Sequence, residues 1–120
     1  MPSKYHNVKC EMDNHKFDSI KEREHYVILK VSKQAGEIAN FSIKPTLWLI
    51  RSKDNFHITW DKTYAKNNLV LFRYTPDFVM THTDGTEEII DVKGGRATQT
   101  DVFKLKKRIL EALGLKITIK

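Results

Sequence analysis

The feature that most constrains the fold is an Asp84-Gly85 pair between two runs of strand-forming residues. The segment around it, residues 74–95, reads YTPDFVMTHTDGTEEIIDVKGG. An Asp-Gly pair flanked by β-branched and aromatic residues predicts a β-hairpin. Because side chains alternate between the two faces of a sheet, the length of the hairpin loop decides which residues face each other.

Two loop lengths give opposite registers for this hairpin. A two-residue loop of Asp84 and Gly85 would place Asp77 and Asp91 on opposite faces of the sheet. A three-residue loop that starts at Thr83, with Gly85 in a left-handed conformation, would place Asp77 directly opposite Asp91.

We favour the three-residue loop because it gives a clean core face together with a shared polar site. Apart from Glu88 near the turn, the side chains on the core face are apolar. They are Phe72, Tyr74, Pro76, Phe78 and Met80 on one side of the turn, with Ile90 and Val92 on the other. On the opposite face, Arg73 and Thr75 would accompany the two acids, with Thr75 opposite Lys93.

Two carboxylates that face each other across paired strands repel, unless one is protonated or a cation lies between them. Oxygen ligands suit Mg²⁺, which takes one or two carboxylates and keeps several of its waters. Lys93 follows Asp91 on the same strand face, where its ammonium could orient or deprotonate a water, or stabilise negative charge in a transition state. The pattern predicts a Mg²⁺ site, with Mn²⁺ as a substitute. In the alternative interpretation, Pro76-Asp77 is a turn and Asp91 and Lys93 form an exposed surface pair.

The other elements predict an α+β fold. Residues 17–37 have helical spacing, with a capping box at Ser19 and Glu22 and an apolar side that includes Ile20, Val27 and Val31. Strand-forming runs then follow, and helical spacing returns after residue 98. In this second helix the expected apolar side comprises Val102, Leu105, Ile109 and Ala112, with Thr98 or Thr100 as the cap.

The order of these elements is α-β-β-β-α-β, which favours a mixed central sheet flanked by helices. A last alternating strand, LKITIK, ends the chain. We expect one domain over residues 17–120, preceded by a basic N-terminal segment over residues 1–16 that forms an arm or a loosely held strand.

Composition limits the classes of function. The 120 residues carry a net charge of +6, which is compatible with a nucleic-acid partner. Cys10 is the only cysteine, so the chain has no internal disulfide and no paired-cysteine zinc motif. No apolar run is long enough to cross a membrane, and residues 1–10 do not resemble a secretory signal, so we expect a cytoplasmic protein. No phosphate-binding loop or nucleophile elbow is present, and no small-molecule cofactor is expected.

These motifs resemble the PD-(D/E)XK nuclease superfamily. The resemblance depends on Pro76-Asp77 and on Asp91-Val92-Lys93, both in strand context, and on the element order. A branch of small phage-encoded nucleases is similar over nearly the whole chain, through the segments KYHN, FDSIKE, QAGEI, YTPDF and DVKG. The resemblance implies a restriction-endonuclease-like core and metal-dependent phosphodiester hydrolysis. It also implies that Asp77, Asp91 and Glu22 hold the metal and that Lys93 is the catalytic lysine.

The helix acid has two candidates. On a helical wheel, Glu24 lies between Ile20, Val27 and Val31, whereas Glu22 points away from them. The family pattern instead places the acid at Glu22, because its distance from Ser19 matches. We favour Glu22 and keep Glu24 as the alternative.

The expected partner is DNA. Basic residues near the two acids are candidates for phosphate contacts: Arg73, Arg96, Lys104, Lys107 and Arg108. By analogy with junction resolvases that share the helix opening, the expected substrate is branched DNA of the Holliday-junction type, cut by a homodimer. The alternatives are a nicking or restriction-like nuclease on linear duplex and an inactive DNA-binding module. Trp48 and Trp60 lie in strand patterns typical of core or interface positions rather than of base-stacking platforms.

Overall fold

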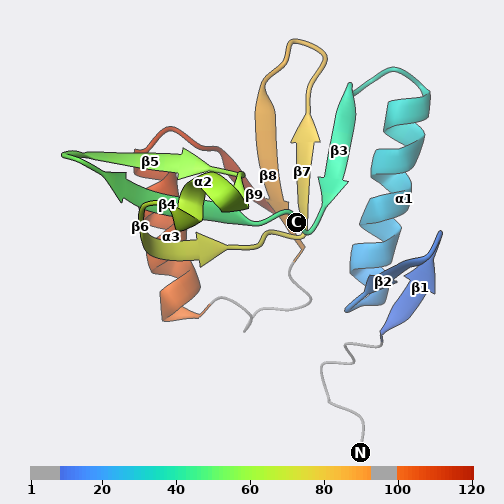
Figure 1. Ribbon diagram of the computed structural model, residues 1–120. Helices are drawn as coiled ribbons and strands as arrows, with labels where there is room; N and C mark the ends of the chain where they lie inside the picture. Colours follow the sequence, from blue (N-terminus) through green and yellow to red (C-terminus); the bar gives the residue numbers. More distant parts are fainter. Residues whose placement is uncertain (1–8, 93–99) are drawn as a thin grey trace, which may run out of the picture.

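The chain folds around a four-stranded mixed sheet in a computed structural model that describes residues 9–92 and 100–120. The strands are β3 (Asn40–Ile43), β7 (Phe78–Thr81), β8 (Glu87–Asp91) and β9 (Ile117–Ile119), hydrogen-bonded in that order (Figure 1). β7 pairs antiparallel with both β3 and β8, whereas β9 runs parallel to β8. A parallel pair needs a crossover connection, and the last helix lies within it.

Two helices cover this sheet from opposite sides (Figure 1). Helix α1 (Ile20–Gln34) packs on the face that carries Phe78 and Ile90. Helix α3 (Asp101–Ala112) packs on the other face, where Leu110 joins a second buried cluster. The first cluster comprises Phe17, Tyr26, Leu29, Ile38, Phe78 and Ile90, and the second comprises Leu47, Tyr74, Val79, Ile89, Leu110 and Ile117. The predicted α+β fold, with a mixed sheet flanked by helices, is confirmed.

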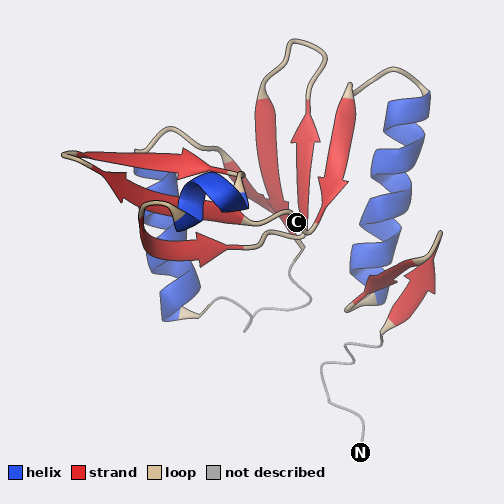
Figure 2. Cartoon of the chain, in the orientation of Figure 1, coloured by secondary structure: helices blue, strands red, loops and turns tan. Residues whose placement is uncertain are grey.

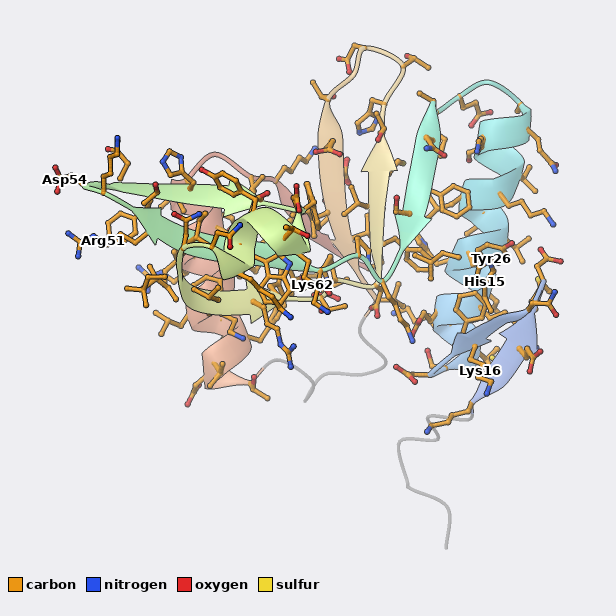
Figure 3. The ribbon with its side chains drawn as sticks, viewed as in Figure 1. His15, Lys16, Tyr26, Arg51, Asp54 and Lys62 are labelled. Atoms are coloured by element: carbon orange, nitrogen blue, oxygen red, sulfur yellow. The ribbon has the colours of Figure 1, made fainter. Side chains whose placement is uncertain are left out.

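A second sheet is inserted between β3 and β7, and it was not expected from the sequence. Its strands are β4 (Leu47–Ser52), β5 (Asn55–Thr59) and β6 (Leu69–Tyr74), in the antiparallel order β5-β4-β6. A short helix, α2 (Lys62–Lys66), connects β5 to β6. Figure 2 displays this sheet beside the central one, and its β4–β5 hairpin carries Arg51 and Asp54 far from β7 and β8 (Figure 3).

The insertion corrects the predicted core face. The strand-like run that includes Phe72 and Phe78 is interrupted at Thr75-Pro76, and its two halves belong to different sheets. Proline has no backbone N–H to donate to a strand ladder, which favours a break at this point. Tyr74 therefore packs with Val79 and Ile89, and not on the Phe78 face as expected.

The register of the β7–β8 hairpin is confirmed. Phe78 pairs with Ile90 and Met80 pairs with Glu88, as the three-residue loop requires. The His82 amide donates to the Thr86 carbonyl at 2.8 Å, and this closes the loop. Gly85 has φ +89°, the left-handed conformation that glycine adopts without a steric penalty.

Helix α1 begins at the predicted cap but presents a different side to the core. The Ser19 side chain accepts from the Glu22 amide at 3.1 Å, a contact worth about 0.5–2 kcal/mol. The buried residues are Glu22, Tyr26 and Leu29. The expected apolar side was wrong, because Ile20, Val27 and Val31 are exposed, as is Glu24.

Helix α3 shows the same kind of error. Thr100 is the N-cap, accepting from the Phe103 amide, and Gly114 adopts φ +100° after the last turn. Val102 and Leu105, however, are about three-fifths exposed, at 62% and 60%. The helix instead buries Leu110 completely.

Part of the expected N-terminal arm is a hairpin. Strands β1 (Cys10–Met12) and β2 (His15–Phe17) pair antiparallel, and Phe17 lies in the core against α1. The Tyr26 hydroxyl donates to Asp13 at 2.7 Å, which ties the hairpin turn to α1. His15 and Tyr26 lie together where the hairpin meets the helix (Figure 3). No helix in the described part of the chain is long and apolar enough to span a membrane.

Candidate functional site

Asp77 and Asp91 meet at one end of the β7–β8 pair. Asp77 immediately precedes β7, and Asp91 is the last residue of β8. The Asp77 amide donates to Asp91 Oδ1 at 3.3 Å, and the Val92 amide donates to Asp77 Oδ2 at 2.7 Å. The carboxylate of Asp91 thus accepts from the backbone amide of Asp77, and the carboxylate of Asp77 accepts from the amide that follows Asp91. This is the placement that the three-residue loop predicted for the two carboxylates.

Tyr74 joins this site from the second sheet. Its hydroxyl donates a hydrogen bond to Asp91 Oδ2. Burial raises the pKa of the Tyr74 phenol, and the bond to Asp91 raises it further. The phenol thus remains a donor at any physiological pH. Its ring lies 6.1 Å from the ring of Phe103 in the first turn of α3, so this end of α3 also approaches the acids.

The Asp77 carboxyl is strongly perturbed. Burial is the main cause that raises its pKa, to about 7, and the nearby negative charges of Glu22 and Asp91 add to the effect. The Val92 amide opposes the shift by stabilising the charged form. At neutral pH a carboxyl of this kind is only partly ionised, and a nearby positive charge would favour its charged form.

Glu22 lies inside the protein near the two aspartates. Its side chain is 3% exposed, and its Oε1 accepts no hydrogen bond from the residues that the structure describes. Lys44 Nζ is 3.5 Å from this oxygen, an ion-pair distance without hydrogen-bond geometry. Burial raises the pKa of Glu22, and the charge of Lys44 opposes that rise. Of the two helix acids, Glu22 is therefore the buried one, and its charge acts on Asp77, whereas Glu24 is exposed.

Lys44 is a site residue that the sequence did not reveal. Its amide donates to the Asp77 carbonyl at 2.9 Å, and its ammonium donates to Asp18 at 3.3 Å. Although burial opposes the shift, the charges of Glu22 and Asp18 raise the pKa of Lys44. No motif spacing links Lys44 to Asp77, because the pairing of β3 with β7 brings them together. Tyr74 was also missed as a site residue, since it was assigned to the core face.

The candidate catalytic lysine, Lys93, and one basic candidate for DNA contact, Arg96, lie outside the described residues. The expected pairing of Thr75 with Lys93 falls there as well.

The remaining basic candidates do not touch the acids. Arg73 precedes Tyr74 in β6 and is exposed, and since Tyr74 points to Asp91, Arg73 points to the opposite side of the strand. The expected position of Arg73 beside the acids was wrong, because Arg73 lies in β6, which belongs to the second sheet and does not pair with β8. Lys107 pairs with Glu111 within α3 at 3.2 Å, and Lys104 and Arg108 are exposed on the same helix.

The donor chemistry of the site fits a hard divalent cation. Two aspartates lie side by side, and Glu22 adds a buried oxygen that accepts no hydrogen bond from the described residues. All three are the oxygen ligands that Mg²⁺ prefers. In the described part of the chain, no three His, Cys, Asp or Glu side chains are arranged closely enough to share an ion. The aspartate pair is thus in place, and Glu22 would need to move toward it to complete a three-acid site.

The fold and the site define an α+β domain with a buried acid cluster at the end of a mixed sheet. The chain belongs to the family described as "Protein of unknown function (DUF1064)", which matches residues 2–118. No curated protein and no solved structure matches the chain in the comparisons made.

Proposed function

We propose that this protein is a divalent-metal-dependent DNA endonuclease. The observation that carries the proposal is the contact between Asp77 and Asp91 at the end of paired strands, with the Asp77 pKa raised to about 7. Facing carboxylates in a buried position destabilise a fold, and a bound cation is the usual reason to keep them. The resemblance of the Pro76-Asp77 and Asp91-Val92-Lys93 motifs to PD-(D/E)XK nucleases supports the same proposal.

In this proposal, Asp77, Asp91 and Glu22 hold Mg²⁺, or Mn²⁺ in its place. The bound ion would polarise a scissile phosphate and lower the pKa of a bound water. Tyr74 keeps Asp91 oriented by donating to one of its oxygens. Lys44 balances the charge of Glu22.

The role of Lys93 is carried over from the nuclease resemblance alone. It would deprotonate the attacking water or stabilise the negative charge that develops at phosphorus. The basic residues of α3 would contribute salt-dependent phosphate contacts.

The proposed substrate is branched DNA of the Holliday-junction type, and the proposed enzyme is a homodimer that cuts two strands symmetrically. A nicking or restriction-like activity on linear duplex is the second candidate. An inactive DNA-binding module is the third, and the buried acids argue against it. A module that only binds DNA gains nothing from carboxylates that repel phosphate.

One assay separates these candidates. Purified protein is incubated with a four-way junction, a flap, linear duplex and single-stranded DNA, in Mg²⁺ or in EDTA. Asp91→Asn keeps an acceptor for Tyr74 and should abolish cleavage, whereas the exposed Glu24→Gln is the matched control and should not change it. Metal-dependent cutting of the junction alone supports the first candidate, and cutting of linear duplex supports the second. Binding without cleavage under any metal would refute nuclease function.

A further inference from the structure

A pocket opens beside the acid site, between the two sheets. Its volume is about 280 Å³, and its described lining comprises Ser42, Pro45, Thr46, Trp60, Val79 and Glu87. Ser42 and Val79 are paired neighbours on β3 and β7, and Glu87 begins β8. Trp60 follows β5 of the inserted sheet, at the end of that strand nearer to β8 (Figure 1).

The pocket lies on the same face of β7 as Asp77. Val79 is two residues after Asp77, so it shares the face of Asp77 at about 7 Å along the strand. Thr46 forms part of the pocket wall, and its hydroxyl oxygen is 3.1 Å from the hydroxyl oxygen of Thr75. Thr75 in turn lies next to Pro76-Asp77. The near wall of the pocket is thus about 7 Å from Asp77 along β7, whereas Glu87 lies four residues before Asp91, about 13 Å away along β8.

The lining has the chemistry of a base site and not of a phosphate site. Trp60 is 36% exposed and supplies an aromatic ring to the lining, while Pro45 and Val79 supply apolar walls. None of the described lining residues is a lysine or an arginine, and the carboxylate of Glu87 repels phosphate. The volume is slightly below the range of about 300–1,000 Å³ that is typical for drug-sized ligands, so a single planar ring system suits it better.

The polar groups of the lining add a preference among bases. A carboxylate accepts hydrogen bonds and cannot donate them, so Glu87 favours a base that presents an amino group. Cytosine carries such a donor at N4, whereas thymine has an acceptor at O4. The hydroxyls of Ser42 and Thr46 can adapt to either kind of partner.

We propose that this pocket binds one unpaired nucleobase of the DNA substrate, stacked on Trp60, with its amino group donating to Glu87. The inference rests on the proposed nuclease function and adds a reason for its substrate class. Removing a base from its stack is least costly where the base is already unpaired, as at a branch point. Stacking on an aromatic side chain then stabilises the unpaired base. Branched DNA would thus fill the pocket more readily than intact duplex.

The first test uses Trp60 fluorescence. The 120-residue chain carries Asp91→Asn to prevent cleavage. Trp48, the other of its two tryptophans, is replaced by phenylalanine so that the fluorescence comes from Trp60. It is titrated with a DNA junction that has one unpaired cytosine at the branch point, and with linear duplex of the same sequence. We expect strong quenching of Trp60 by the junction and little by the duplex.

The second test concerns the base preference. With thymine in place of the unpaired cytosine, we expect binding to be weaker by about tenfold or more, the range of one hydrogen bond to a charged acceptor. Glu87→Gln should remove this difference, because an amide both donates and accepts. Trp60→Ala should weaken binding of the unpaired junction, while Phe56→Ala, which removes an exposed aromatic outside the pocket, should not.

The outcomes separate the two proposals. Junction binding without quenching of Trp60, or equal affinity for cytosine and thymine in the unmodified pocket, would overturn the base site and leave the nuclease proposal intact. If no DNA of any structure is bound or cleaved by the wild-type protein, both proposals fail.

Discussion

The hydroxyl of Tyr74 donates to the carboxylate of Asp91, although the two residues belong to different sheets. The inserted three-stranded sheet thereby reaches into the acid site of the central sheet. Asp91 ends β8, and its side chain is 4% exposed, so a lost hydrogen bond at this position is not replaced easily by water.

Tyr74→Phe tests this connection between the sheets. It keeps the ring against Phe103 and removes the donor, so the free energy of unfolding should fall by about 1–3 kcal/mol. Cleavage should fall about tenfold, because Asp91 loses the group that orients it, as expected for a loss of about 1.4 kcal/mol in the transition state. Urea unfolding and single-turnover cleavage measure the two effects. Tyr64→Phe, on the exposed side of α2, is the control, and equal values for both variants would contradict the assigned role of Tyr74.

The raised pKa of Asp77 predicts a pH dependence of stability without metal. In the unfolded chain this carboxyl loses its proton near pH 3.8, and in the folded protein near pH 7. Between these values the folded state holds a proton that the unfolded state has lost, so the contribution of Asp77 to the free energy of unfolding decreases as pH rises. Asp77→Asn removes this loss while keeping an acceptor for the Val92 amide.

The free energy of unfolding of Asp77→Asn, measured relative to that of the wild-type protein, should therefore be higher at pH 8 than at pH 4. Urea unfolding in EDTA at the two pH values measures the difference. Glu24→Gln, which changes an exposed carboxyl, should show no such trend. A difference between Asp77→Asn and wild type that is the same at both pH values would refute the raised pKa.

The hairpin and the helices show what could be predicted from the sequence and what could not. The Asp77–Asp91 pairing was predictable, because strand alternation and a glycine turn are local properties. The buried side of α1 was not, since apolar residues lie on two sides of that helix and only packing selects Tyr26 and Leu29. Lys44 was hidden for a related reason, because its place depends on long-range strand pairing.

Lys44 should stabilise the acid cluster when no metal is bound. Lys44→Met removes the cation that lies 3.5 Å from the buried Glu22 oxygen, and the remaining negative charges then repel one another. The free energy of unfolding in EDTA should fall, and Mg²⁺ should restore a part of it by supplying positive charge. Lys53→Met is a matched control, because Lys53 has a similar backbone φ of +56° at an exposed position. Equal stability of the two variants in EDTA would contradict the role given to Lys44.

The choice of Glu22 as the helix acid predicts a difference in metal-linked stability. A ligand that binds only the folded state increases the free energy of unfolding, by about 2.7 kcal/mol when its concentration is 100 times its Kd. The melting temperature rises as a result. The ligand here is Mg²⁺, added to the protein without DNA. The rise should be reduced in Glu22→Gln and unchanged in Glu24→Gln, as measured by differential scanning calorimetry. The reverse pattern would assign the role to Glu24.

The claim that Asp77 and Asp91 bind a divalent ion is tested most directly by paramagnetic broadening with Mn²⁺. Two-dimensional ¹H–¹⁵N spectra of the protein are recorded while Mn²⁺ is added at low stoichiometry. We expect the amide signals of Asp77 and Val92, which donate to the two carboxylates, to broaden first, and we expect this broadening to be lost in an Asp77→Asn, Asp91→Asn double variant. Broadening that begins at another acidic position, such as Glu88 at the far end of β8, or that survives in the double variant, would contradict the metal site.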